Sequence, residues 1–156
     1  MEVAWAMRAS FYSRRGVARV GWFGGPLLAS VALGMHHIGF WRFHMQDATV
    51  PTVALTLVLA PLLEELAFRG GLQELLRSGF RVLEVADRQP LSWANLLTTV
   101  VFCACHLPSH SVQLVFAIAI PSIFLGYLYE ITRSLTLCVA MHMWFNTCLL
   151  MAFWWM

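Results

Sequence analysis

The sequence predicts an all-α fold: a polytopic transmembrane helical bundle of about five spans, with a basic interfacial segment at the amino terminus. Hydrophobic residues make up 60% of the 156 residues and charged residues only 12%, and the mean hydropathy is +0.70. These values are far from those of a soluble domain. The apolar residues form runs of bilayer-spanning length between short polar connections. No repeat or linker divides the chain, so we expect one membrane-embedded domain over residues 1–156.

The first forty residues divide into a basic half and an apolar half. Residues 1–20 hold four arginines among aromatic residues, a composition typical of an amphipathic helix on the membrane surface. Residues 21–40 are apolar over a longer stretch than a signal-peptide core, and no clear cleavage pattern follows them. We therefore expect a retained first span, with His36 and His37 in the membrane interface at its far end.

Four more spans follow in order. The second, 50–76, continues as an amphipathic tail, because Glu74, Arg77 and Arg81 fall on one helix face by their spacing. The most loop-like stretch, 84–90, comes next. The remaining spans are placed at 91–106, at 111–129 with Pro121 as a kink, and, after a return loop at 130–134, at 135–156, where Trp154 and Trp155 form an interfacial anchor.

The charged residues indicate an orientation and exclude one class of partner. With a cytoplasmic amino terminus the inner segments hold eight of the ten arginines, whereas the outer loops hold only Arg42, which fits the positive-inside rule. The net charge of +2, without lysine or a basic run, argues against nucleic-acid binding. The four cysteines lie in apolar segments without zinc or redox spacing, so we expect buried, reduced thiols. For a small chain whose basic residues are all arginine, we expect a location in a bacterial inner membrane.

Two adjacent carboxylates, Glu64 and Glu65, interrupt the second span. An ionisable residue inside a membrane segment costs several kcal/mol unless it is paired or lines a wet cavity, so such a residue indicates a functional site. Arg69 lies one helical turn after Glu65 and can neutralise it. Glu64 is left to face another group. The alternative is a boundary helix whose first charges mark its exit to water.

Three further polar residues lie inside later spans: His106, His142 and Asn146. The second and third spans form a hairpin centred near residue 85, so residues whose numbers sum to about 170, such as Glu64 and His106, lie at equal depth. Phe102 lies one turn before His106, and His142 one turn before Asn146. His142 is only ~12 Å above the inner loop by residue count. It reaches the depth of Glu64 if the loop at 130–134 lies deeper than the loop before residue 91, or if the second helix extends its tail into the cytoplasm, which the spacing of Glu74, Arg77 and Arg81 supports.

These residues form three motifs in order, each on its own span. E-E-L-A-F-R at 64–69, F-C-A-C-H at 102–106 and H-M-W-F-N at 142–146 resemble the E-E-x-x-x-R, F-x-x-x-H and H-x-x-x-N motifs of the CAAX-protease and bacteriocin-processing intramembrane endopeptidases. The chain has fewer spans than larger members of that family and almost nothing after the third motif. The difference bears on the substrate class more than on the chemistry.

The resemblance implies an intramembrane glutamic endopeptidase without a metal cofactor. Glu64 would be the general base, with His106 holding and polarising the water. His142 and Asn146 would stabilise the oxyanion, and Glu65, Arg69 and Phe102 would support these groups. Its partners would be the lipid bilayer and a membrane-embedded or lipid-anchored protein or peptide. Processing of a peptide or membrane anchor is then favoured over cleavage of a prenylated protein.

Two alternatives stay open at this stage. A glutamate and two histidines can hold a catalytic zinc ion, although the H-E-x-x-H pattern is absent and asparagine is a poor zinc ligand. The chain could also be a non-catalytic scaffold or a proton-coupled transport element, because intramembrane carboxylates and histidines build proton relays too.

Overall fold

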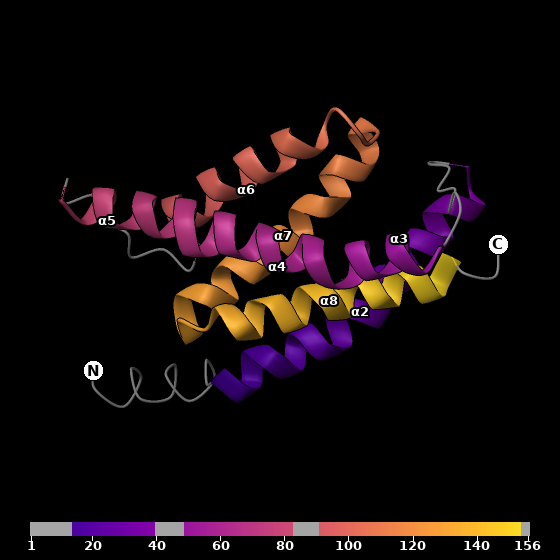
Figure 1. Cartoon of the computed structure of the whole chain (residues 1–156), viewed down its shortest axis with the longest axis horizontal. Helices are drawn as coiled ribbons and strands as arrows, with labels where there is room; N and C mark the ends of the chain where they lie inside the picture. The colour runs from indigo at the N-terminus through magenta and orange to yellow at the C-terminus, as the bar shows by residue number, and fades with distance from the viewer. Residues whose placement is uncertain (1–13, 40–48, 83–90, 154–156) are drawn as a thin grey trace.

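The structure, a computed structural model, describes residues 14–39, 49–82 and 91–153, and this part of the chain is helical with no strand (Figure 1). A long continuous helix, here called the long helix, combines three α-helical and two π-helical segments. In chain order the elements are α2 (Arg14–His37); the long helix, made of α3 (Val50–Ala54), η1 (Leu55–Leu59), α4 (Ala60–Glu65), η2 (Leu66–Gln73) and α5 (Glu74–Val82); α6 (Trp93–His106); α7 (Val112–Thr132); and α8 (Leu135–Phe153). The predicted all-α bundle is confirmed.

The number of membrane spans is about four rather than five. Among the described residues, Val50–Phe80, Val112–Thr132 and Leu135–Ala152 are long and apolar enough to cross a membrane, and α6 is a shorter apolar helix. The expected first span, 21–40, forms most of α2, but α2 is not among those three. Its apolar run is interrupted by glycines and ends in two histidines. The protein is a multi-pass membrane protein, and α2 packs along α8.

Two predicted segments differ in the structure. Arg14 begins α2, so in the described part the basic residues from 14 onward belong to that helix and not to a separate interfacial segment. The expected return loop, 130–134, is too long, because α7 continues to Thr132. Arg133 adopts a left-handed conformation with φ 54° and donates its N–H to the carbonyl of Tyr129, which ends α7. Residues 1–13, 40–48, 83–90 and 154–156, including the loop at 84–90 and the terminal tryptophans, lie outside the described residues.

The helix starts follow from capping side chains. Thr49, Ser92 and Ser111 each have extended backbone and accept a hydrogen bond from the N–H three residues later, at α3, α6 and α7 respectively. Such caps satisfy one of the N–H groups that a helix start leaves unpaired. The starts of these three helices lie within two residues of the predicted starts at 50, 91 and 111.

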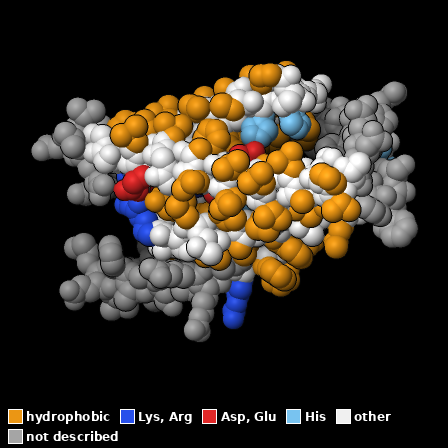
Figure 2. Space-filling model, in the orientation of Figure 1, with side chains coloured by type: hydrophobic (Ala, Val, Ile, Leu, Met, Phe, Trp, Pro, Cys, Tyr) orange, Lys and Arg blue, Asp and Glu red, His pale blue; other side chains and the backbone are white. Residues whose placement is uncertain are grey.

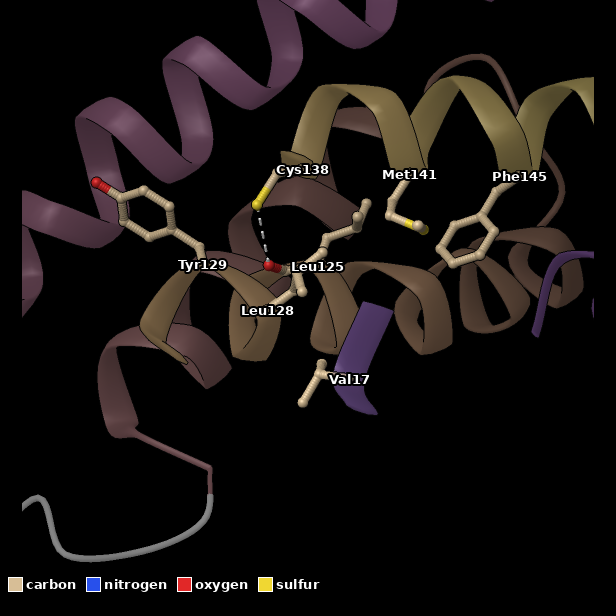
Figure 3. Packing of buried hydrophobic residues seen from close by; sticks show 7 residues of the cluster. All are labelled: Val17, Leu125, Leu128, Tyr129, Cys138, Met141 and Phe145. Atoms are coloured by element: carbon tan, nitrogen blue, oxygen red, sulfur yellow. Dashed lines mark hydrogen bonds between the residues drawn. The ribbon is translucent and has the colours of Figure 1, made fainter. Parts of the chain in front are cut away.

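The main apolar cluster lies where α2, α7 and α8 meet (Figure 3). Its buried members are Val17, Leu125, Leu128, Tyr129, Cys138, Met141 and Phe145. Cys138 donates its thiol to the carbonyl of Leu125 at 3.7 Å. The expected burial of the thiols is confirmed for Cys138 and Cys148 but is wrong for Cys105, which is exposed, and Cys103 is half-buried. Nearby, the rings of Trp22 and Trp144 stack with centroids 4.3 Å apart.

On the other side of α7, a glycine permits close packing against α6. A Cβ atom built on Gly126 would lie 1.9 Å from Oδ1 of Asn95. Asn95 in turn donates its amide to the carbonyl of Ile123 at 3.0 Å. Close helix contact through a small residue, together with a side-chain hydrogen bond, is typical of membrane helix packing.

Candidate active site

The long helix buries one residue in every four along its middle. Its buried face consists of Pro61, Glu65, Arg69 and Gln73, and the residues between them are mostly exposed. An α-helix of 3.6 residues per turn would rotate such a series away from one side. The wider π turns raise the average toward four residues per turn, so the four side chains stay in one line.

Glu65 and Arg69 form a fully buried ion pair on this face. The distance from Nε of Arg69 to Oε2 of Glu65 is 3.3 Å, and both side chains are 0% exposed, as the sequence predicts. Arg69 also donates through Nη2 to the carbonyl and the hydroxyl of Ser122 on α7, at 3.0 and 3.1 Å. Its guanidinium carbon lies 5.6 Å from the centroid of the Phe102 ring. Arg69 therefore connects the long helix to α6 and α7.

His142 lies between the two glutamates. Its Nδ1 is 2.9 Å from Oε1 of Glu65, and its Nε2 is 3.6 Å from Oε2 of Glu64. Because an ionised carboxylate only accepts hydrogen bonds, Nδ1 carries the hydrogen that bonds Glu65. The side chain of Glu64 is 27% exposed, whereas that of Glu65 is completely buried. Glu64 is thus the carboxylate of the pair that a substrate or water can reach.

The depth of His142 is explained by the pairing of α8 with the long helix. Arg133, at the turn before α8, forms an ion pair with Glu74. Nine residues separate Glu65 from Glu74, and nine separate Arg133 from His142. The two antiparallel helices therefore bring His142 level with Glu65. Beyond the level of the turn before α8, the long helix continues as α5, which is the amphipathic tail predicted from the sequence.

His106 lies near this group without bonding to Glu64 directly. Its ring centroid is 4.5 Å from that of Phe102, and the Phe102 ring is 6.4 Å from His142 and 4.9 Å from Phe68. The contact between Phe68 and Phe102 confirms the hairpin register, since their numbers also sum to 170. Within the described residues, no hydrogen bond or ion pair joins His106 to Glu64.

The divergence of α6 from the long helix accounts for this spacing. Figure 1 shows α6 moving away from the long helix toward the α6–α7 connection, the end that carries His106. Figure 2 shows histidine and acidic side chains next to each other on this face, surrounded by hydrophobic residues. Polar groups thus reach the surface here among hydrophobic side chains, apart from the acidic and basic side chains at one end of this face.

The Nδ1 atom of His106 lies 2.8 Å from the carbonyl oxygen of Phe102. A carbonyl only accepts, so Nδ1 carries the hydrogen, and a neutral His106 has an unprotonated Nε2. That nitrogen can accept a hydrogen bond from water.

Asn146 does not share the contacts of His142. Its amide nitrogen donates to the backbone carbonyl of Thr56 at 3.0 Å, in the π-helical segment η1. The sequence spacing places Asn146 one turn from His142, which is correct, but gives no sign of this bond to the long helix.

Several polar residues near the site were not anticipated from the sequence. Gln73 is fully buried and donates to the carbonyl of Gly126 at 3.1 Å and to Glu130 at 3.0 Å, and Ser92 also donates to Glu130. Ser122 donates to Thr99 at 3.2 Å. The available signal was a set of polar residues inside apolar spans.

The described residues contain no group of three or more His, Cys, Asp or Glu side chains placed to hold a metal ion. His142 is hydrogen-bonded to Glu65, and its other ring nitrogen lies 3.6 Å from Glu64.

Comparison with known proteins identifies the family. Residues 46–148 match the family model described as type II CAAX prenyl endopeptidase Rce1-like. Neither a curated protein nor a solved structure matches the chain. The family consists of intramembrane endopeptidases that act on membrane-associated proteins. The match spans well over half of the 156 residues and includes all three motifs, so the chain belongs to the Rce1-like family of CAAX endopeptidases.

Proposed function

We propose that this protein is a metal-independent, glutamic-type intramembrane endopeptidase in which Glu64 is the general base. One observation carries the proposal: His142 is bonded to buried Glu65 through one ring nitrogen and faces the accessible Glu64 with the other. The ion pair with Arg69 anchors this arrangement. It sets an accessible carboxylate beside an oriented imidazole, the elements that general acid–base catalysis needs.

In the proposed reaction Glu64 takes a proton from water, and the oxygen attacks the carbonyl carbon of the scissile peptide bond. The carbonyl π bond breaks to give an oxyanion, which accepts a hydrogen bond from Nε2–H of protonated His142. Collapse of the intermediate restores the carbonyl and breaks the C–N bond, and Glu64 gives its proton to the leaving amine. With His142 protonated, the row Glu64, His142, Glu65 and Arg69 has alternating charges and no net charge.

His106 and Asn146 have less direct roles in this scheme. The hydrogen bond from Nδ1 of His106 to the carbonyl of Phe102 leaves Nε2 free to accept a hydrogen bond from the attacking water. This supports His106 as the residue that holds and polarises the nucleophile. One N–H of the Asn146 amide donates to Thr56, which leaves only the other for an oxyanion.

The proposed substrate is a membrane-embedded or lipid-anchored protein or peptide. Exposed leucines, Leu62, Leu63 and Leu66, flank Glu64 on the long helix, so the approach to the base is through an apolar surface. A segment already dissolved in lipid can move along this surface without crossing water. We further propose that the protein lies in a bacterial inner membrane with its amino terminus in the cytoplasm, as the arginine distribution favours.

The test is cleavage by the purified protein reconstituted in lipid vesicles. Reporter peptides with a transmembrane anchor or a prenyl group, and a matched soluble peptide, would be incubated with the wild-type chain and with Glu64→Gln. Mass spectrometry would look for new termini. We expect cleavage of at least one anchored reporter, none of the soluble peptide, and loss of cleavage in Glu64→Gln. Unchanged cleavage by that variant would refute the assignment of the base.

A control variant and a chelator make the result specific. Glu74→Gln alters an exposed ion pair away from the site and should keep full activity. Treatment with a strong chelator should leave the rate unchanged. Loss of activity that zinc restores would replace the proposed mechanism with the metal-dependent one. Failure to cleave any reporter, joined to a cellular effect that survives Glu64→Gln, would favour a scaffold.

A further inference from the structure

The long helix does not supply the backbone carbonyl of Thr56 with its usual hydrogen-bond donor. In an α-helix it would accept from the N–H of residue 60, and in a π turn from that of residue 61. The N–H of Ala60 donates instead to Leu55. Residue 61 is Pro61, which has no N–H. Neither usual donor is available to Thr56.

Such a carbonyl is costly at this depth. Thr56 lies inside the segment Val50–Phe80, which is long and apolar enough to span the membrane. The bilayer core offers no water to replace a missing hydrogen bond. Asn146, on α8, donates its amide to this carbonyl at 3.0 Å. The side chain therefore supplies the donor that the Ala60 bond and Pro61 together remove.

The hydrogen bond from Asn146 to Thr56 lies at the π turn that precedes Pro61 and the two glutamates. Pro61 would clash with the carbonyl of Leu57 in a regular α-helix, and the wider turn of η1 before it accommodates the ring. One residue more or less in a turn rotates the rest of the helix by about 100°. Glu64 and Glu65 follow directly. The turn thus decides which of the two glutamates is buried against Arg69 and which stays accessible.

We infer that Asn146 is a positioning residue: it holds the π turn before Pro61 and thereby fixes the rotation of the Glu64–Glu65 helix against His142. This inference deepens the proposed function and rests on it for its activity readout. Because Asn146 and His142 lie on the same face of α8, one rigid element holds both the long helix and the imidazole. The alternative is that Asn146 acts chiefly as an oxyanion donor.

The two roles differ in how Asn146 is coupled to Pro61. In Pro61→Ala the long helix gains an N–H that can serve Thr56 without help from α8. The experiment is a double-mutant cycle of Asn146→Ala and Pro61→Ala, with unfolding in detergent and kcat and KM on a cleaved reporter as readouts. Thr147→Ala is the matched control, because the Thr147 hydroxyl donates within its own helix, to Met143.

For a positioning residue we expect Asn146→Ala to lower the folding equilibrium constant roughly five- to a hundred-fold and to lower kcat with little change in KM. In the Pro61→Ala background the same substitution should change the folding equilibrium constant and kcat by less than about threefold each. This is the rescue that a positioning role requires. Thr147→Ala should show no coupling to Pro61.

An oxyanion donor gives a different pattern. Asn146→Ala would then lower kcat by about 10²- to 10³-fold equally in both backgrounds, with folding unchanged, and that result would overturn the inference. If Pro61→Ala alone abolishes turnover, the unfolding measurements decide: an equal loss of stability in both backgrounds also overturns it. If the wild-type chain cleaves no reporter, the proposed function fails, while the coupling in stability still tests the role of Asn146.

Discussion

The two sides of α7 and α8 are packed by different kinds of contact. Toward α2 most contacts are apolar or aromatic, as in the cluster of Figure 3 and the stacked pair Trp22 and Trp144, whose indole N–H also donates to the Trp22 backbone carbonyl. Toward the long helix and α6 they are polar and buried: Glu65, Arg69 and Gln73 all bond to side chains or carbonyls of α7 or α8. The candidate active site lies entirely on the polar side.

The two kinds of contact contribute differently to stability because the solvent is lipid and not water. Lipid is as apolar as leucine, so burying an apolar side chain between membrane helices yields little of the free energy it yields in water. A hydrogen bond or buried ion pair has few alternative partners in lipid and therefore specifies one arrangement of helices. We conclude that the polar side fixes the geometry of the site, whereas the α2 side adds contact area. Substitutions on the polar side should therefore cost more activity or stability than substitutions on the α2 side.

The largest effect is expected at Glu64. Glu64→Gln keeps the shape of the side chain and removes the proton acceptor, so the rate of peptide cleavage should fall by about 10²- to 10⁴-fold. The unfolding midpoint in detergent should stay close to that of the wild type, because Glu64 is the partly exposed member of the pair. A large loss of stability with a normal rate per folded molecule would show that Glu64 belongs to the structural group instead.

The next largest effect is expected at Glu65. Glu65→Gln leaves Arg69 buried without its counter-charge, and breaking a buried pair costs about 3–5 kcal/mol of unfolding free energy. It also weakens the bond that orients His142, so the cleavage rate should fall as well. The matched exposed pair is Glu74 and Arg133. Glu74→Gln should cost no more than about 1 kcal/mol by the same unfolding assay, and equal costs at both pairs would contradict the comparison.

Much of the polar side could be predicted from the sequence, because its charges are exceptional in an apolar span. The pairing of Glu65 with Arg69 follows from their spacing of four, and the equal depth of the second and third spans follows from the hairpin register, which the contact between Phe68 and Phe102 confirms. The family was identified from its three motifs, each on a separate helix.

Other features depend on geometry that no local pattern records. The π turns of the long helix, the bond from Asn146 to Thr56 and the second bond of His142, to Glu65, all arise from contacts between segments about 75 to 90 residues apart or from the Pro61 ring. The divergence of α6, which separates His106 from Glu64, is likewise a tertiary effect. Spacing along one regular helix could place these residues at the right level but not choose their partners.

A smaller effect, of stability alone, is expected at Gly126. Gly126→Ala would put a Cβ atom 1.9 Å from Asn95, and such overpacking costs typically about 1–3 kcal/mol. Gly34→Ala is the matched control on α2, where a Cβ atom meets nothing within 4 Å. There the change should be neutral or stabilise the helix by up to about 1 kcal/mol. Thermal unfolding in detergent distinguishes the two, and similar shifts of both variants would show that α6 and α7 are not closely packed.

The smallest effect is expected at Trp22, on the apolar side. Trp22→Ala removes the ring stacked on Trp144, and such aromatic contacts are worth about 0.5–1.5 kcal/mol. The hydrogen bond between the helices survives, because the Trp144 indole donates to the backbone carbonyl of residue 22 and not to its side chain. The cleavage rate per folded molecule should therefore stay unchanged while the unfolding midpoint falls slightly. A marked fall in the cleavage rate without loss of folded protein would show that α2 helps to shape the site, and that the catalytic geometry is not fixed by the polar side alone.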